Sequence, residues 1–328
     1  MNPDTSGAWT AEITVAPGPG PVAWAHFTDH YVMSPWQVEG ETLIRALTAP
    51  GTGSVVTASR NAGGVDDADI RIQVTSADPL DDSALDSVIE TLRQTLGLAD
   101  DVSDFYSTVV PSDPVLSAAA AHGLRGARLK TSPGVFEAIV AALASQNVHF
   151  SRTFHVMACL TESLGVPVEH PRGVAYTFPT PEALADASDD LLRSCGLGYR
   201  ARLLRGLVTR LVDSGIDLDA LRDEPNTDIV REALMDLPGV GPFTADLVLS
   251  IGFRRPAFHL DSYTRTIFET LYGLPPADDA MLQFVEQRFG RWKHYAMLLL
   301  TTDTEQWATD LGVEFPIRSA ASYRLPDT

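Results

Sequence analysis

Lysine is nearly absent from this sequence. Of its 24 basic residues only Lys130 and Lys293 are lysines, so arginine supplies almost all of the positive charge. The 43 acidic residues outnumber the basic ones and give a formal net charge of −19. This balance disfavours a surface that binds polyanions everywhere, although one local face can still be basic. It also fits a GC-rich genome or a cytoplasm of high salt, in which phosphate contacts are weak.

Cysteine and long apolar runs are scarce as well. Cys159 and Cys195 lie in apolar helical patterns, and we expect buried thiols, with a disulfide as the alternative. No apolar run approaches the roughly 20 residues that a membrane helix needs. The N-terminus also lacks the basic start and apolar stretch of a signal peptide. We therefore expect a cytoplasmic protein with no membrane partner.

The chain divides by pattern into two parts. The first alternates as strands at residues 9–15, 42–47, 54–58 and 70–74, followed by a helix at 82–96. From residue 114 to about 311 the pattern is helical throughout, with helices expected at 151–164, 181–195, 199–213, 227–236, 242–252, 262–272, 277–289 and 292–302. We predict an α+β fold: a mixed α/β lobe with an antiparallel sheet over residues 1–112, a mostly α-helical core over 113–318, and a disordered tail over 319–328.

A short turn between two predicted helices is the most informative segment. It reads Leu237-Pro238-Gly239-Val240-Gly241-Pro242, and a helix follows it. Glycines at this spacing permit torsions that side chains forbid, and they bare backbone N–H groups at a helix N-terminus. Such a turn suits a DNA phosphate and carries no base preference. A plain helix-capping turn is the alternative.

Asp261 stands twenty residues after Gly241, directly before another helical pattern. An aspartate at that place is a typical N-cap. A carboxylate there can also act in chemistry, and the two interpretations are compatible.

These segments resemble the helix-hairpin-helix DNA glycosylase superfamily, in the branch that joins 3-methyladenine DNA glycosylase II and 8-oxoguanine DNA glycosylase. The resemblance spans about residues 30 to 312. Besides the hairpin it rests on four segments: 126–129, 136–152 with Ser145-Gln146-Asn147-Val148, 196–202, and 289–296. The first two resemble the family's segment that inserts into the lesion gap. The resemblance implies a two-lobed helical core, damaged double-stranded DNA as the partner, and a monomer.

The resemblance also assigns chemistry to individual residues. Asp261 matches the family's essential carboxylate, which stabilises positive charge on the deoxyribose and orients water. Bifunctional members carry a nucleophilic lysine where this chain has Phe243, so we expect a monofunctional enzyme that leaves an abasic site. Phe243, Tyr263 and Trp292 are candidates for the base pocket, together with His149 and Phe150. Core packing is the alternative for these side chains.

A second set of residues matches positions that contact DNA in the family. Asn147 corresponds to the residue that fills the gap left by the flipped base. Tyr199 and Arg200 correspond to residues that wedge the stack and contact the orphaned base, and Arg152 corresponds to a second such arginine. The hairpin residues Gly239, Val240 and Gly241 would bind phosphate. Ordinary helix ends, core packing and solvated surface are the competing interpretations.

The resemblance also bears on cofactors and metal ions. No cofactor is required, and relatives bind a monovalent cation through hairpin carbonyls that match Met235, Leu237 and Val240. An iron–sulfur cluster needs four cysteines, and this chain has two.

Two features of the sequence favour different lesions as the substrate. Phe243 favours alkylated purines, which leave easily, whereas 196–202 with Asn147 and Arg152 favours 8-oxoguanine. We favour alkylated purines because the nucleophile position bears directly on chemistry. A non-catalytic helix-hairpin-helix protein that binds damaged DNA would share the hairpin, and an unrelated helical enzyme would share the helical pattern.

Overall fold

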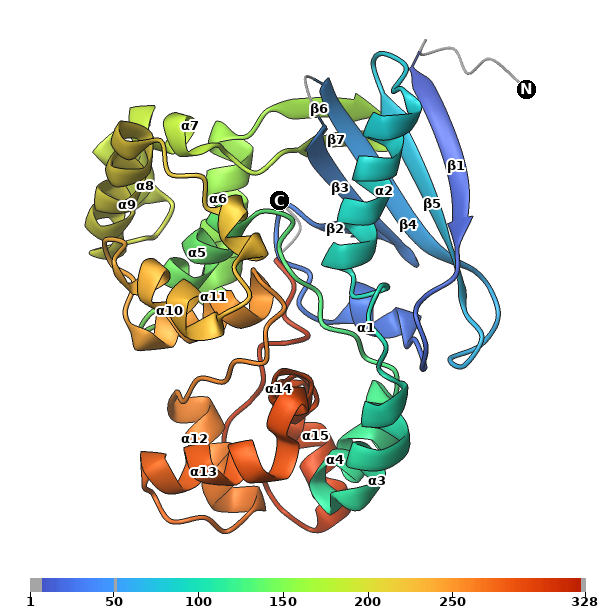
Figure 1. The fold of residues 1–328 in the computed structure, drawn as a ribbon, viewed down its shortest axis with the longest axis vertical. Coiled ribbons are helices and arrows are strands. Elements are labelled where there is room, and N and C mark those ends of the chain that lie inside the picture. The colour runs from blue at the N-terminus through green and yellow to red at the C-terminus, as the bar shows by residue number, and fades with distance from the viewer. Residues whose placement is uncertain (1–7, 50–51, 326–328) are drawn as a thin grey trace.

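The computed structural model describes residues 8–49 and 52–325 and opens with an antiparallel sheet (Figure 1). Its strands are Trp9–Val15 (β1), Gln37–Glu39 (β2), Thr42–Ala49 (β3), Thr52–Ala62 (β4) and Asp69–Ser76 (β5). They lie in the order β1-β5-β4-β3-β2, and every pairing is antiparallel. The predicted antiparallel sheet of the N-terminal lobe is therefore confirmed. The sequence pattern missed β2 and the short helix Trp24–Asp29 (α1).

Both faces of this sheet are covered. Helix Asp82–Thr95 (α2) packs Val88 and Leu92 onto the face that presents Ile70 and Ile72. A hairpin of Pro167–His170 (β6) and Gly173–Tyr176 (β7) reaches the sheet from the helical part, where Ala175 packs on Ile44 and Val55 (Figure 1). The prediction of a helix pattern unbroken from 114 to 311 is wrong here, because Gly173 adopts a φ of 137° that turns the chain into a hairpin.

The rest of the chain is helical. In chain order the helices are Val110–Ser112 (α3), Pro114–Ala119 (α4), Val135–Ala144 (α5), Ser151–Leu164 (α6), Pro181–Asp186 (α7), Asp189–Ser194 (α8), Arg200–Ser214 (α9), Thr227–Met235 (α10), Pro242–Ile251 (α11), Ser262–Leu271 (α12), Asp278–Phe289 (α13), Lys293–Thr301 (α14) and Thr304–Trp307 (α15). The predicted helix 181–195 is two helices, because Ser188 accepts a hydrogen bond from the Leu191 amide and caps a new start. Across residues 8–49 and 52–325, no helix combines the length and the apolar character that crossing a bilayer requires.

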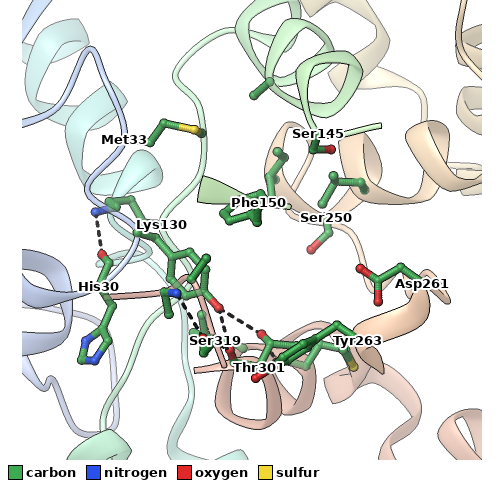
Figure 2. A pocket seen from close by; sticks show the side chains of 18 of the residues that line it. His30, Met33, Lys130, Ser145, Phe150, Ser250, Asp261, Tyr263, Thr301 and Ser319 are labelled. Atoms are coloured by element: carbon green, nitrogen blue, oxygen red, sulfur yellow. Dashed lines mark hydrogen bonds between the residues drawn. The ribbon is translucent and has the colours of Figure 1, made fainter. Parts of the chain in front are cut away.

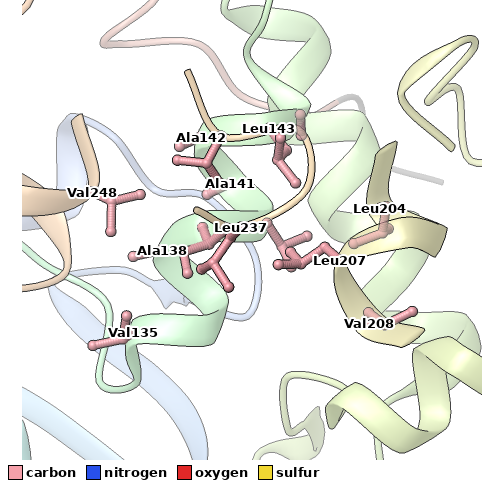
Figure 3. Close-up of a cluster of buried hydrophobic side chains, with 14 of the residues drawn as sticks. Val135, Ala138, Ala141, Ala142, Leu143, Leu204, Leu207, Val208, Leu237 and Val248 are labelled. Atoms are coloured by element: carbon pink, nitrogen blue, oxygen red, sulfur yellow. The ribbon is translucent and has the colours of Figure 1, made fainter. Parts of the chain in front are cut away.

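Two hydrophobic clusters divide these helices into lobes. The first surrounds α5, whose Ala138 and Ala142 are fully buried among Leu204, Leu207 and Val248 from neighbouring helices (Figure 3). The second joins residues 102–129 to residues 258–317, so it combines segments from before and after the first lobe. The helical part is thus two-lobed, as the family resemblance implies.

A disulfide links the first lobe internally. Cys159 of α6 and Cys195, at the end of α8, are bonded, with their Cα atoms 5.2 Å apart. The expectation of two buried thiols is wrong, because the two helices bring the sulfurs face to face.

The C-terminal tail is ordered as far as it is described. The Ser319 hydroxyl donates to the Thr301 carbonyl at 2.8 Å, and the Ala321 carbonyl accepts from the Tyr31 amide at 2.6 Å. Ala321 itself is buried. The prediction of disorder is therefore wrong for residues 319–325, because tertiary contacts hold them, and residues 326–328 lie outside the described residues.

One buried arginine joins the N-terminal lobe to the second helical lobe. Arg128 is fully buried, and its guanidinium donates only to backbone carbonyls, those of Gly18, Pro19, Gly20, Pro21, Gly97 and Asp100, at 2.7–3.4 Å. These bonds gather two separate loops around one cation. The resemblance of residues 126–129 to a lesion-gap segment is therefore misleading, since they lie inside the protein.

Replacing Arg128 by Met should destabilise the fold by about 3 kcal/mol or more, because several buried carbonyls lose their donors at once. Urea unfolding followed by tryptophan fluorescence would measure the change. Arg125→Met is the matched control, since Arg125 is exposed and forms a surface ion pair with Asp66. Equal midpoints for the two variants would contradict this account of Arg128.

Candidate active site

Asp261 is the N-cap residue of α12. Its Oδ1 accepts from the Thr264 amide at 2.7 Å, and its own amide donates to Thr264 Oγ1 at 2.8 Å. This reciprocal pair is a capping box, which fixes the rotamer of the aspartate. Within the described residues, Oδ2 takes part in no hydrogen bond. The capping interpretation of Asp261 therefore leaves one oxygen of the carboxylate available for chemistry.

That carboxylate faces a cavity of about 360 Å³ between the three parts of the molecule. Figure 2 shows Asp261 on one side of this cavity, with Phe150 and Tyr263 as neighbouring walls. Five aromatic side chains line it: Tyr31, Trp36, Phe150, Phe243 and Tyr263. A mostly apolar cavity with a few convergent polar groups is the usual form of a small-molecule site, and its flat aromatic walls suit a planar base.

Phe243 enters the cavity from the start of α11. Its ring meets the ring of His259 edge-on at 4.9 Å. Burial lowers the pKa of His259, while the neighbouring Asp261 carboxylate raises it in part. At neutral pH His259 is therefore an uncharged neighbour of the carboxylate.

Of the two remaining base-pocket candidates, one lies in the cavity and the other lies outside it. Tyr263 lines the cavity and donates to Thr304 Oγ1 at 2.9 Å, and burial raises its pKa. Trp292 does not line it. Its indole N–H donates to Asp104 at 3.2 Å, and its ring packs 5.5 Å from that of Phe105 in the second cluster. The prediction that Trp292 belongs to the base pocket is therefore wrong, because its face is taken by core packing.

The two glycines of the hairpin between α10 and α11 differ in backbone conformation and in their surroundings. Gly239 has a φ of 80°, and a Cβ there would lie 3.0 Å from the Cβ of Leu203. Gly241 is extended, and a Cβ there would meet nothing within 4 Å. No side chain caps α11, and the space at Gly241 is open, so a phosphate could approach the amides of Gly241 and Phe243 on either side of Pro242.

The hairpin carbonyls also suit a small cation. Among the described hydrogen bonds, the carbonyls of Met235 and Val240 accept none, and that of Leu237 accepts one from the Val240 amide at 3.1 Å. Carbonyl oxygens are hard ligands that fit an alkali cation better than a transition metal. No group of three or more His, Cys, Asp or Glu side chains in the described ranges could hold a metal ion.

The loop 145–150 has one side in the cavity and one side on the surface. Ser145, His149 and Phe150 line the cavity. Asn147 has a φ of 52° and points outward, where its Nδ2 donates to the exposed Tyr199 hydroxyl at 3.0 Å. Two predicted DNA-contacting residues that lie far apart in the sequence are thus brought together.

Gln146 connects this loop to the hairpin. Its Nε2 donates to the Gly239 carbonyl at 3.0 Å and to Thr244 Oγ1 at 2.8 Å. The loop that borders the cavity and the turn that suits a phosphate are therefore hydrogen-bonded to each other.

Arg200 lies beneath this surface instead of on it. It is buried, and it donates to the carbonyls of Ala144, Gln146, Gly196 and Leu197 at 2.7–3.2 Å. The prediction that Arg200 contacts the orphaned base is wrong for this structure, because backbone carbonyls occupy its donors. Arg152 stays exposed and lies against Gly196, where a Cβ would collide with the guanidinium.

Several cavity residues were not among those predicted for the base pocket. Tyr31 and Trp36 come from the N-terminal lobe, Lys130 from the segment that links the lobes, and residues 317–321 from the tail. Their distance in sequence from Asp261 hides them. The rarity of lysine was a signal that could have singled out Lys130.

Comparisons with known proteins agree with this geometry. Residues 140–291 match the model of the family described as HhH-GPD superfamily base excision DNA repair protein. The chain is 30% identical over 232 residues to a probable N-glycosylase/DNA lyase of Methanothermobacter thermautotrophicus, covering 64% of this chain and 73% of that protein.

Solved structures show the same fold. A 3-methyladenine DNA glycosylase from Archaeoglobus fulgidus superposes with a TM-score of 0.73 at 22% identity, covering 89% of this chain and 97% of that one. A Clostridium acetobutylicum 8-oxoguanine glycosylase/lyase, in complex with double-stranded DNA containing cytosine opposite 8-oxoguanine, superposes with a TM-score of 0.67 at 20% identity, covering 88% and 92%.

The family model matches the segment that holds the hairpin, the loop 145–150 and Asp261, and the curated relative extends the match over most of its own length. The chain belongs to the HhH-GPD superfamily of base excision DNA repair proteins, a family of DNA glycosylases.

Proposed function

We propose that this chain is a monofunctional DNA glycosylase that hydrolyses the N-glycosidic bond of a damaged purine, with Asp261 as its catalytic carboxylate. One observation carries the proposal. The free oxygen of Asp261 and the inner side of loop 145–150 face the same cavity, while the outer side of that loop presents Asn147, which contacts Tyr199 at the start of α9. A base that leaves the duplex beside Asn147 would enter the cavity next to the carboxylate.

The chemistry follows from that arrangement. Breaking the bond between base and sugar builds positive charge on the deoxyribose, and a preorganised carboxylate stabilises it. The capping box holds Oδ1 of Asp261, so Oδ2 is the oxygen that would face the sugar or orient water. The aromatic walls would hold the flipped base by stacking.

The monofunctional assignment is supported by the hairpin. Phe243 occupies the place of the lysine in bifunctional relatives, and its ring packs on His259. The other amine in the cavity, Lys130, donates to the carbonyls of Phe27 and His30 at 3.2 and 3.3 Å. Neither position offers an amine held against the sugar, so water is the expected nucleophile.

Alkylated purines are the favoured substrates. Their positive charge makes them good leaving groups, and an aromatic cavity attracts cations. The burial of Arg200 also removes one expected contact to an opposite cytosine. 8-Oxoguanine is the second candidate, favoured by the contact between Asn147 and Tyr199 and by the Clostridium acetobutylicum neighbour.

The partner is duplex DNA, with the hairpin amides around Gly241 as a phosphate site. The carbonyls of Met235, Leu237 and Val240 would hold a monovalent cation that stiffens this turn. Exposed Arg152, beside Gly196, adds positive charge next to Asn147.

Asp261→Asn should lower base excision by about 100-fold or more, because asparagine keeps the N-cap acceptor but loses the charge. Single-turnover release from duplexes with one defined lesion measures this. Thr264→Val is the control: it removes a partner of the capping box and keeps the carboxylate. It should lower stability and retain most activity per folded molecule. Full activity of Asp261→Asn would refute the assignment.

The reaction product should be an intact strand with an abasic site. Strand breaks would appear only after alkali, and borohydride should trap no covalent complex, because hydrolysis forms no Schiff base. Spontaneous breakage without trapping would point to handling damage. Trapping that persists in Lys293→Met and disappears in Lys130→Met would instead reveal a lyase.

Tyr199→Ala should weaken binding to lesion-containing duplex by about tenfold, the loss typical of one stacking side chain. Asn147→Ala should also weaken it, because the side chain expected to fill the gap is lost. Binding is measured in the Asp261→Asn background so that the base stays attached. Leu282→Ala, also an exposed apolar truncation but on α13, should leave affinity unchanged. Unchanged affinity in both Tyr199→Ala and Asn147→Ala would remove these residues from the DNA interface.

A further inference from the structure

The cavity has a second charged end, far from the catalytic carboxylate in sequence. Lys130 lines it, and in Figure 2 Lys130 and Asp261 lie on opposite sides with Phe150 between them. The ammonium of Lys130 has two backbone acceptors, the carbonyls of Phe27 and His30. An ammonium has three donors, so one is left for a ligand.

No carboxylate balances this amine. Within the described residues Lys130 forms no ion pair, and its aromatic neighbour is Trp36, whose ring centroid lies 5.8 Å from Nζ. The carboxylate of Glu137, on α5, is engaged by Arg45 of β3. The cavity therefore holds a cationic group whose charge is free to act on a bound base.

The titratable groups around Lys130 include two arginines, three histidines and the carboxylates of Glu137 and Asp303, which are held in ion pairs. Arg45 and Arg324, from β3 and the tail, both disfavour its charged form. On α1, His26 is buried and its pKa is lowered by desolvation and by His30. His30 in turn pairs with Asp303 at 2.9 Å. On α14, burial lowers the pKa of His294 to about 4.

We propose that Lys130 is a specificity-determining residue that sets the charge of the base pocket and thereby selects between cationic and neutral bases. When protonated, it donates to a carbonyl on a neutral base such as hypoxanthine and repels an alkylated, cationic purine. When neutral, it admits the cation. This inference rests on the proposed glycosylase function, since it concerns which base that cavity accepts.

In addition to this geometry, Lys130 changes its charge near neutral pH. Burial, together with the charges of the two arginines, lowers the pKa of Lys130 to about 7. Below that pH the amine is charged, and above it the amine is neutral. Neutral bases should therefore be favoured on the acid side and cationic bases on the alkaline side.

The test compares two lesions across pH. Excision of hypoxanthine and of 3-methyladenine, which stays cationic throughout, is measured from about pH 5.5 to about pH 8.5, with spontaneous release subtracted. In wild type the ratio of cationic to neutral excision should rise about tenfold over this range, as one unit charge is removed. Effects of pH that are common to both lesions cancel in the ratio.

Three variants test whether the pH dependence of the excision ratio comes from Lys130. Lys130→Met should give a high ratio that no longer varies with pH. Lys130→Arg should give a low, constant ratio, because arginine stays charged and preserves the donors to the two carbonyls. Lys293→Met, in which the other lysine loses its ion pair with Glu286, should behave as wild type. A constant wild-type ratio, or a wild-type pH profile in Lys130→Met, would overturn the proposal.

A second readout does not depend on catalysis. With only two lysines in the chain, NMR of protein labelled with ¹³C-lysine gives two signals to assign. In the Asp261→Asn background, binding of hypoxanthine duplex should raise the pKa of Lys130, and binding of methylated duplex should lower it. If wild type excises neither base but Lys130 responds in this way, the glycosylase assignment fails and the charge selection stands. A Lys130 signal that ignores both duplexes would refute it.

Discussion

The hydrogen bond from the Thr264 amide to Asp261 is the contact on which the candidate site depends. This bond engages one carboxylate oxygen at the start of α12, and the other oxygen is directed at the cavity. In the proposed function, the helix cap and the reactive carboxylate are thus the same side chain. Phe243 from α11 and His259 from the segment before α12 line the same cavity, and their rings meet edge-on.

Two buried arginines of this protein hold backbone segments together. Arg128 gathers loops of the N-terminal lobe, and Arg200 joins loop 145–150 to the turn before α9. A planar guanidinium with five donors can satisfy several carbonyls at once, which a lysine cannot. The large arginine count is therefore a poor guide to a DNA-binding face, and the acidic net charge is a poor argument against one. Exposed Arg152 and the bare amides at Gly241 are local features that a sum of charges does not describe.

Local patterns predicted much of the fold. Alternation marked β1, β3, β4 and β5, and the helical spacing marked most helices, because these depend on neighbours along the chain. The hairpin β6–β7 was missed, since its residues become strands through packing of Ala175 on the sheet. Trp292 and Arg200 were misplaced for a related reason: burial against distant segments decides whether a side chain faces a cavity, the core or solvent.

The sequence by itself determined the family, the hairpin turn and the place of Asp261, because short motifs with fixed spacing encode local backbone geometry and a cap. Through the resemblance it also predicted that Phe243 stands where bifunctional members carry their lysine. Only the tertiary structure decided which walls enclose the carboxylate. Tyr31, Trp36 and Lys130 reach the cavity from segments that precede the hairpin by a hundred residues or more. A cavity is formed by segments that meet only when the lobes pack, and no pattern within one segment records what it will face.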